Sequence, residues 1–318
     1  MGDPAGIGPE ICVKALAGEA IRDICIPIVV GDLNTLRRTA EFLQTDVTFE
    51  NGRSEKKEGI TVVESREKLY DFKVGIDAAK TGKAAASYIE TAVEIWRRGE
   101  IDAIATAPIS KKALSLAGYD FPGHTEFLAH LTGSKRVGMS FFGGNLRVAL
   151  LSTHVSLSDA IKRVRKENLI ELIQFANREL GLLLDRRPRL AVAGLNPHAS
   201  EGGMFGSEET EEIAPAVTES QAAGIDISGP YSPDTIFLRC HRGEFDAVIA
   251  LYHDQATIPV KAFSFGSAVN VTLGLPLIRT SVDHGTAFDI AGKGVADASS
   301  MVAAIKLAAV LAGLQKQG

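Results

Sequence analysis

The sequence predicts an α/β protein built from two α/β/α domains with a cleft between them. The chain has 318 residues, which is more than a single hydrophobic core usually supports. Short apolar runs typical of strands alternate along it with amphipathic stretches typical of helices. This alternation favours parallel sheets whose faces are covered by helices. Three of the predicted strands also end close to a histidine, where open parallel sheets bind their ligands.

The first half of the chain begins with a loop rich in glycine and proline. The predicted elements after it are a helix from about Pro9, a buried strand over 26–32, a helix over 34–44, mixed strand and loop over 46–73, a solvated turn at the charge run 53–58, an amphipathic helix over 82–98 and a strand over 101–107. Glu10 lies in the first turn of the first helix, where a carboxylate favours the positive helix end. The turn before it is either a tight connection or a ligand loop, because short glycine motifs are weak evidence. Such a loop normally follows a strand, so we expect the natural protein to have residues before Met1.

The second half repeats the pattern of strands and helices. The predicted elements are a strand over 146–152, a helix over 165–183, a strand over 189–194, a helix over 208–224 and a strand over 245–251. The segment 201–209 is either a mobile lid or a plain connector. We expect a terminal domain of residues 1–118 and 265–318 and a central domain of residues 119–264.

Composition limits the classes of partner. The hydrophobic content of 45%, the net charge of −5 and the pI near 5.9 are those of a soluble protein, with no electrostatic reason to bind nucleic acid or an anionic membrane. The three cysteines are scattered and form no C-x-x-C pair, which favours a reducing compartment. No apolar run approaches the length of a membrane span. We therefore expect a cytoplasmic protein.

The strand-end histidines predict a metal site. His154, His198 and His253 each follow a predicted strand. A single histidine is more often structural, but three at equivalent strand ends suit a divalent ion such as Zn²⁺ or Co²⁺, with positions left free for substrate. The histidines are far apart in the sequence, so no local sequence motif identifies them as metal ligands.

Two further groups of residues suit an anion. The turn at 121–126 opens a helix at which His124 and Thr125 are able to hold a phosphate or carboxylate; alternatively, Thr125 simply caps the helix. Lys261, Asn270 and Arg279 suit a phosphate clamp, although each is also compatible with an ordinary surface position.

The segment from His284 to Gly294 has the sequence HGTAFDIAGKG. Its glycines allow close backbone approach to a nucleotide. The chain has no G-x-G-x-x-G after a predicted strand, so a classical Rossmann dinucleotide fold is not expected.

Taken together, these motifs resemble the 4-hydroxythreonine-4-phosphate dehydrogenase family, within the isocitrate and isopropylmalate dehydrogenase-like superfamily. The stretches that carry the resemblance are MGDPAGIGPE, TAPISK, GHTEFLA, STH, GLNPHASEGG, GPYSPDT, YHDQ and VNVTLGLPLIRTSVDHGTAFDIAGKG. They cover nearly the entire chain. The resemblance implies a homodimer whose active sites draw on both subunits.

The resemblance also implies an activity. The family oxidises 4-phosphooxy-L-threonine with NAD or NADP and a divalent metal (Zn, Co or Mg), and the product loses CO₂ to give 3-amino-2-oxopropyl phosphate. Close relatives act instead on D-threonate or D-erythronate 4-phosphate, and the quoted motifs do not separate the two groups. A phosphate acetyltransferase-like enzyme and a binding protein that has lost the chemistry are further alternatives.

The candidate site residues fall into four sets, of which the resemblance supports the metal and substrate sets directly. The metal ligands are His154, His198 and His253, shared between dimer partners; the substrate residues are His124, Thr125, Lys261, Asn270 and Arg279; the nucleotide residues are Gly285, Asp289, Gly292 and Lys293; and the candidates for the general base are Lys111, Asp234 and Asp254.

Overall fold

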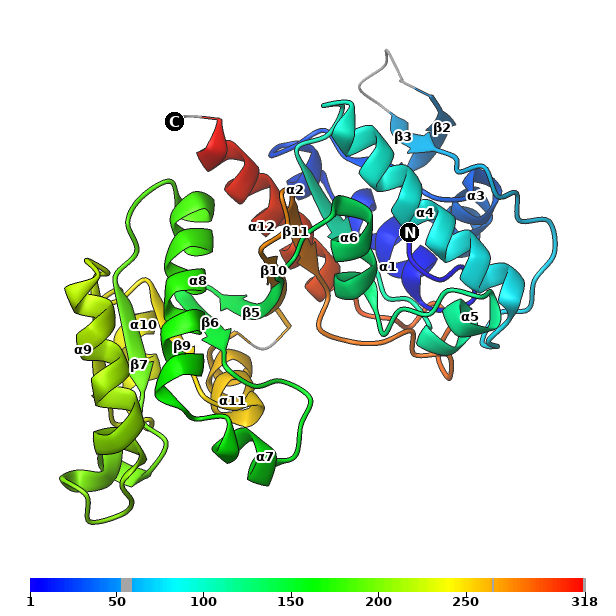
Figure 1. Ribbon diagram of the computed structural model, residues 1–318. Coiled ribbons are helices and arrows are strands. Elements are labelled where there is room, and N and C mark those ends of the chain that lie inside the picture. The colour runs from blue at the N-terminus through cyan, green and yellow to red at the C-terminus, as the bar shows by residue number, and fades with distance from the viewer. Residues whose placement is uncertain (53–58, 265, 317–318) are drawn as a thin grey trace. The chain divides into compact units, whose positions relative to one another are not determined.

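The computed structural model describes residues 1–52, 59–264 and 266–316 (Figure 1). The turn expected at 53–58 lies outside these residues. The chain forms two compact units: unit 1 consists of Met1–Val137 and Leu275–Ala312, and unit 2 of Gly138–Gly274 with the chain end from Gly313. Residues 119–137, expected in the central domain, belong to unit 1. Phe127 and Leu128 are buried in the same core as Ala86 and Ile89 of unit 1.

Unit 1 contains two groups of parallel strands. Its elements are α1 (Gly8–Ala17), α2 (Glu19–Arg22), β1 (Ile28–Val30), α3 (Leu33–Phe42), β2 (Thr48–Asn51), β3 (Gly59–Val63), α4 (Ala79–Arg97), β4 (Ala103–Thr106), α5 (Lys111–Leu116), α6 (His124–Thr132), β11 (Ile278–Ser281) and α12 (Ser299–Gln315). The strands β1, β3 and β2 form a parallel sheet in that order, and β4 pairs in parallel with β11. Apolar side chains of α1 and α3 pack on the three-stranded sheet.

Unit 2 is built around one mixed sheet with strand order β10-β5-β6-β9-β7-β8. Its elements are β5 (Gly138–Gly143), β6 (Leu146–Leu150), α7 (Leu157–Lys162), α8 (Lys166–Leu184), β7 (Leu190–Ala193), a 3₁₀ turn η1 (Pro197–Glu201), a π-helical turn η2 (Glu209–Ile213), α9 (Ala214–Ala222), β8 (Ile227–Tyr231), α10 (Ile236–His241), β9 (Ala247–Ala250), α11 (His253–Phe263) and β10 (Val269–Leu273).

The expectation of parallel sheets is met only in part in unit 2, where β6, β9, β7 and β8 pair in parallel. The strand β5 runs antiparallel to both β6 and β10. Only Gly144 and Asn145 separate β5 from β6, and Gly144 has a φ of +57°. Two residues allow a hairpin but are too few for the crossover that a parallel pair needs.

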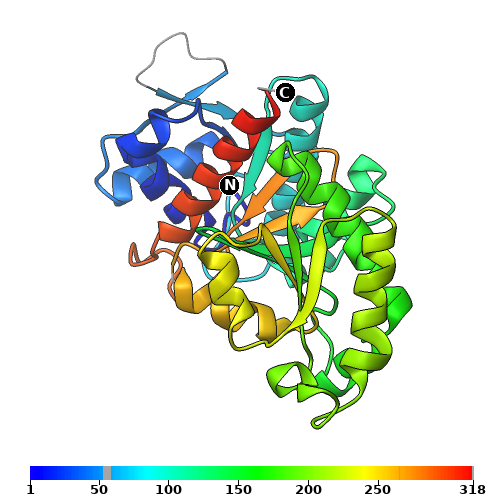
Figure 2. The same cartoon turned by 90° about the vertical axis from the view of Figure 1, so that its left-hand side faces the viewer.

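Helices cover both faces of the sheet in unit 2. Side chains of α10 and α11, including Phe237 and Val260, share a buried core with Val148 and Val248 of the strands. Figure 2 shows α10 and α11 on one face and α8 and α9 on the other. This layering is the α/β/α arrangement that the sequence predicts.

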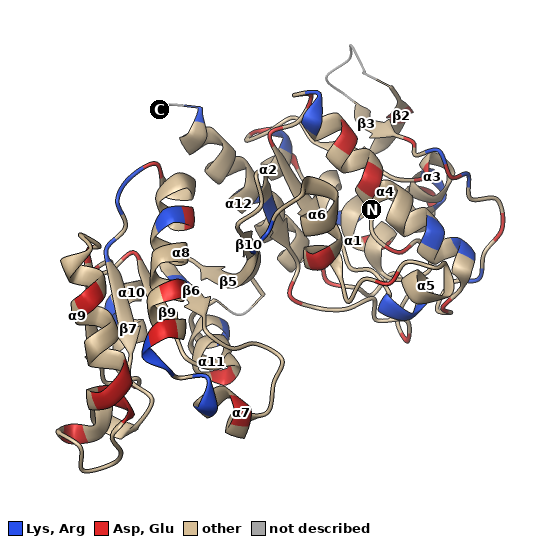
Figure 3. Ribbon diagram, in the orientation of Figure 1, with Lys and Arg blue, Asp and Glu red and all other residues tan. Residues whose placement is uncertain are grey.

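Charged residues lie mainly on helices and connections (Figure 3). The central strands β7 and β9, with the sequences LAVA and AVIA, are buried at every position. Among the described residues, no helix is both long enough and apolar enough to cross a membrane.

Candidate active site

Three neighbouring parallel strands of unit 2 are each followed by one of the predicted metal ligands. The strand β9 pairs in parallel with β6 on one side and with β7 on the other. His154 follows β6, His198 follows β7, and His253 is the first residue of α11 after β9. Because the three strands point the same way, the three histidines lie at the same edge of the sheet.

Two of these histidines lie close together. The ring centres of His154 and His253 are 5.9 Å apart. A Zn–N bond is about 2.1 Å long, so two imidazoles on one ion have ring centres about 5 to 6 Å apart. The Nδ1 atom of His253 is 2.7 Å from Oδ1 of Asp254, a contact of the kind that orients a metal-binding imidazole. This pair fits a divalent metal ion.

His198 lies on a separate, unusual turn. Its φ is +54°, and Ala199 and Ser200 also have left-handed backbone angles. The ring of His198 lies 6.4 Å from that of Phe205. Leaving aside residues 53–58, 265 and 317–318, no three His, Cys, Asp or Glu side chains form a group able to hold a metal. A complete three-histidine site therefore stays a prediction.

Sequence reasoning missed the residues that hold these strand ends in place. Gln255 is buried; its Oε1 accepts from the Leu251 N–H and its Nε2 donates to the Gly194 carbonyl, both at 2.7 Å. It thereby ties the end of β9 to the end of β7. The available signal was that Gln255 sits within the HDQ motif, one turn into a helix that begins at a strand end.

A buried carboxylate supports the turn that carries His198. Glu209 accepts hydrogen bonds from the backbone N–H groups of Leu195 and Asn196, each at 2.7 Å. The amide nitrogen of Asn196 also donates to Glu208 and Glu209. Glu208 and Glu209 belong to the segment interpreted as a lid or connector, and they anchor the strand-end turn instead.

In unit 1, Arg279 of β11 is a buried cation. It is 4% exposed, and its Nε and Nη2 donate to the hydroxyl of Thr106 at 3.2 and 2.8 Å. The Thr106 hydroxyl in turn donates to the Thr280 carbonyl. Its oxygen lone pairs therefore remain to accept from Arg279. Burial lowers the pKa of Arg279 to about 10, opposed by the charge of Glu126. Arg279 thus keeps its positive charge at neutral pH.

The start of α6 lies within the electrostatic reach of Arg279. Burial, followed by the charge of Arg279, holds the pKa of His124 well below its usual range, so its imidazole is neutral. The N-cap of α6 is Gly123 and no side chain caps the helix; the alternative in which Thr125 is the cap is therefore wrong. The first N–H groups of such a helix point outward and favour an anion. The methylene chain of Lys111 lies beside Gly123.

The other two substrate candidates belong to unit 2. Lys261 is exposed on α11, and Asn270 is half-buried on β10. The Oδ1 atom of Asn270 is buried and has no hydrogen-bond partner among the described residues. An orphaned buried acceptor of this kind suits a ligand or a water molecule.

The carboxylates considered as general bases are both exposed and belong to unit 2. Asp234 accepts a hydrogen bond of 2.6 Å from Ser232, and Asp254 contacts His253. The contact with His253 favours a role for Asp254 in orienting that imidazole over a role as the general base.

The nucleotide candidates lie between β11 and α12 in unit 1. Gly285, Asp289, Gly292 and Lys293 are all exposed. Gly292 has a φ of +77°, and a Cβ atom there would meet Val74 at 3.1 Å. Only glycine fits this conformation without strain.

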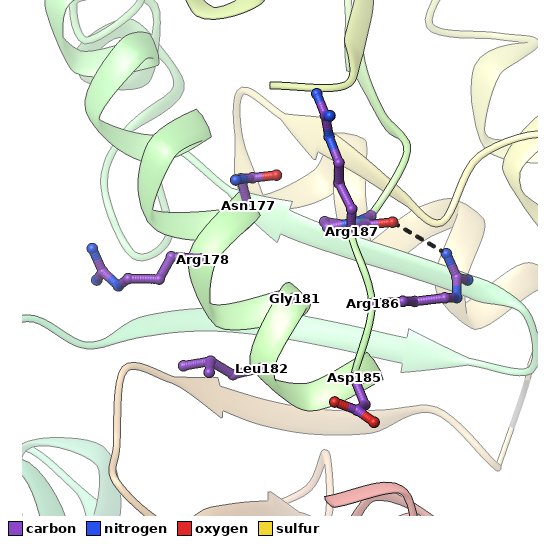
Figure 4. A pocket seen from close by; sticks show the side chains of 8 residues that line it. Asn177, Arg178, Gly181, Leu182, Asp185, Arg186 and Arg187 are labelled. Carbon is purple, nitrogen blue, oxygen red and sulfur yellow. Dashed lines mark hydrogen bonds between the residues drawn. The ribbon is translucent and has the colours of Figure 1, made fainter. Parts of the chain in front are cut away.

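A surface pocket of about 460 Å³ lies at the end of α8, and none of its lining residues is a predicted site residue (Figure 4). Its lining includes Arg178, Leu182, Asp185, Arg186 and Arg187. The guanidinium of Arg186 is already engaged by Asp246, with N–O distances of 2.6 and 2.8 Å. The pocket therefore carries none of the chemistry predicted from the sequence.

Residues 23–308 match the family model described as "Pyridoxal phosphate biosynthetic protein PdxA". The chain belongs to this family. A 4-hydroxythreonine-4-phosphate dehydrogenase of Geobacter metallireducens is 45% identical over 100% of this chain and 96% of its own length. A D-threonate 4-phosphate dehydrogenase of Salmonella typhimurium is 44% identical over 98% of this chain and 97% of its own.

The fold of this family member is also that of solved relatives. The crystal structure of a 4-hydroxythreonine-4-phosphate dehydrogenase from Klebsiella pneumoniae matches with a TM-score of 0.90 and 43% identity, covering 98% of each chain. The predicted α/β fold class and family resemblance are both confirmed.

Proposed function

We propose that the chain is an NAD- or NADP-dependent and divalent-metal-dependent dehydrogenase. In this proposal it oxidises 4-phosphooxy-L-threonine, and the product loses CO₂ to give 3-amino-2-oxopropyl phosphate. The observation that carries the proposal is the row of histidines at the ends of three adjacent parallel strands in a chain of this family. A cytoplasmic homodimer is part of the proposal.

His154, His198 and His253 are the proposed ligands of a Zn, Co or Mg ion. When bound, the ion lowers the pKa of the substrate hydroxyl and stabilises the negative charge that decarboxylation creates. Asp254 holds the His253 ring through Nδ1, so that the imidazole presents its other nitrogen to the ion. Gln255 and Glu209 keep the strand ends fixed.

The phosphate of the substrate is assigned to cationic and neutral donors. Arg279 supplies a buried positive charge that is oriented by Thr106. His124 and Thr125 supply donors at the start of α6, and Lys261 and Asn270 complete the set. Because the phosphate does not react, its binding energy serves to hold the reacting carbon in place.

The nicotinamide nucleotide, which accepts the hydride, is assigned to Gly285, Asp289, Gly292 and Lys293. Their exposure and the glycine backbone angles favour close approach of a ligand. Lys111, Asp234 and Asp254 remain the candidates for the general base.

A second candidate function has direct support from the relatives. The Salmonella typhimurium relative at 44% identity is named for D-threonate 4-phosphate. D-Threonate or D-erythronate 4-phosphate carries the same phosphate and an oxidisable hydroxyl.

One comparison of the two substrates tests both candidate functions. NADH or NADPH formation is measured with 4-phosphooxy-L-threonine and with D-threonate 4-phosphate at equal concentration, before and after exhaustive chelation. The proposal expects faster NADH or NADPH formation with the amino acid ester and loss of activity on chelation, restored by Zn, Co or Mg. A strong preference for the threonate ester would transfer the assignment to the second function. Full activity without metal would overturn the metal site.

A further inference from the structure

The helix α1 and the segment 284–296 are far apart in the sequence but packed together within unit 1. Ile7, Ile11 and Ala15, spaced one helical turn apart, share a buried core with apolar residues of that segment, among them Ile290 and Ala296. The backbone N–H of Ile7 also donates to the Thr286 carbonyl at 3.0 Å. One face of α1 therefore packs against the segment 284–296.

Two charged side chains next to this apolar face reach the backbone of the segment. Glu10 is 4% exposed, and its Oε1 accepts from the Gly292 N–H at 2.5 Å. The ammonium of Lys14 donates to the carbonyls of Gly294 and Ala296 at 2.8 and 2.6 Å. The i, i+4 spacing ordinarily predicts an ion pair between Glu10 and Lys14. Here each side chain binds the backbone of the segment instead: Glu10 accepts from one N–H group, and Lys14 donates to two carbonyl groups.

The held backbone has a shape that few residues allow. Gly292 and Gly294 have φ values of +77° and +71°, and a Cβ atom at Gly294 would meet Leu43 at 3.2 Å. Glycine turns of this kind are intrinsically free to move. Charge-assisted hydrogen bonds on both sides of the turn restrict that freedom.

We propose that Glu10 and Lys14 are positioning residues for nucleotide binding: they clamp the 292–296 backbone in the conformation that receives the nicotinamide nucleotide. Neither residue touches the nucleotide in this proposal. Their contribution is preorganisation, since a segment that is already ordered loses less entropy when its ligand binds. The inference rests on the proposed assignment of the nucleotide to residues 285–293.

The clamp is tested first without any ligand. Hydrogen–deuterium exchange across residues 284–296 is measured in the full-length chain and in Glu10→Met and Lys14→Met. The proposal expects faster exchange of this segment in both variants. Glu10→Gln keeps an acceptor oxygen and Lys14→Arg keeps a donor cation, so both should exchange more slowly than the methionine variants. Arg38→Met, on the exposed side of α3, is the matched control and should resemble the unchanged protein. Unchanged exchange in both methionine variants would overturn the clamp.

The second measurement is the Kd for NADH or NADPH, followed by fluorescence titration of the same proteins. The dissociation constant should rise about tenfold or more in Lys14→Met and Glu10→Met, as expected for loss of a charge-assisted hydrogen bond. The KM for the phosphorylated substrate should change much less. Faster exchange with an unaltered Kd would show that the clamped segment does not serve the nucleotide. If the unchanged protein binds neither nucleotide, the proposed function fails before the variants are compared.

Discussion

The histidine edge of unit 2 and the glycine segment of unit 1 are organised in opposite ways. In unit 2 each candidate ligand lies within five residues of the end of β6, β7 or β9, so strand order alone brings them to one edge. In unit 1 the segment 284–296 is held by a helix 282 residues earlier in the chain, through the contact between Glu10 and Gly292. A site made of strand ends is specified by topology, whereas a site made of loops depends on long-range contacts.

The histidine edge of unit 2 and the buried Arg279 of unit 1 also differ in what their polar side chains contact. At the histidine edge, polar side chains such as Gln255 and Glu209 satisfy backbone groups of neighbouring strand ends. In unit 1 the buried Arg279 is oriented by the hydroxyl of Thr106. Changes in the two regions should therefore separate into losses of turnover and losses of affinity.

The largest effect is expected at the histidine edge. His198→Ala should reduce turnover by roughly a thousandfold or more, because a metal ligand is lost from the reacting centre. The side chain is exposed, so the far-ultraviolet circular dichroism spectrum should be retained. His130→Ala, at an exposed histidine of α6, is the control. Normal turnover in His198→Ala would remove this residue from the metal site.

The next effect is expected in unit 1, on substrate affinity. Arg279→Ala should raise the KM for the phosphorylated substrate about tenfold to a hundredfold, since it removes a buried charge-assisted donor. Arg279→Lys should recover only part of this, because lysine lacks the two-pronged geometry. Initial rates at varied substrate concentration give the KM, with Arg178→Ala as control. An unaltered KM would exclude Arg279 from the phosphate clamp.

A smaller effect is expected on the stability of unit 2. Gln255→Leu leaves the Leu251 N–H and the Gly194 carbonyl buried without their partner. The free energy of unfolding should fall by about 2 to 4 kcal/mol, as measured by urea denaturation. Gln174→Leu replaces an exposed glutamine of α8 and should change it little. Similar losses in both variants would show that the bridge between β7 and β9 is not specific.

The smallest effect is expected from the titration of His124. Its pKa is lower in the folded chain than in the unfolded chain, so the unfolded chain takes up the proton first as the pH falls. The contribution of His124 to stability is full above about pH 6.5 and is lost below it, with a slope of at most about 1.4 kcal/mol per pH unit. Comparing unfolding free energies of the unchanged chain and His124→Gln between pH 7 and pH 5 measures this slope. Equal slopes would contradict a neutral His124 imidazole in the folded chain.

The sequence predicted the strands that carry the histidines because each is a short apolar run with a polar residue just beyond it. The predicted strands 146–152, 189–194 and 245–251 contain β6, β7 and β9. It did not predict the antiparallel β5, because the pairing direction of a strand is set by its connection and its neighbours. The sequence also did not predict that Gln255 joins the ends of β7 and β9, because a single polar residue in a sequence does not show which backbone groups its side chain contacts.

The sequence by itself determined the α/β class, the family and the residue types at the candidate site. These follow from local properties: periodicity, strand-end chemistry and motif order along the chain. Only the tertiary structure decided that β9 lies between β6 and β7, that Thr106 orients Arg279, and that Glu10 and Lys14 hold the 292–296 backbone. These contacts join residues distant in the chain, and their energies depend on burial and direction that no local pattern encodes.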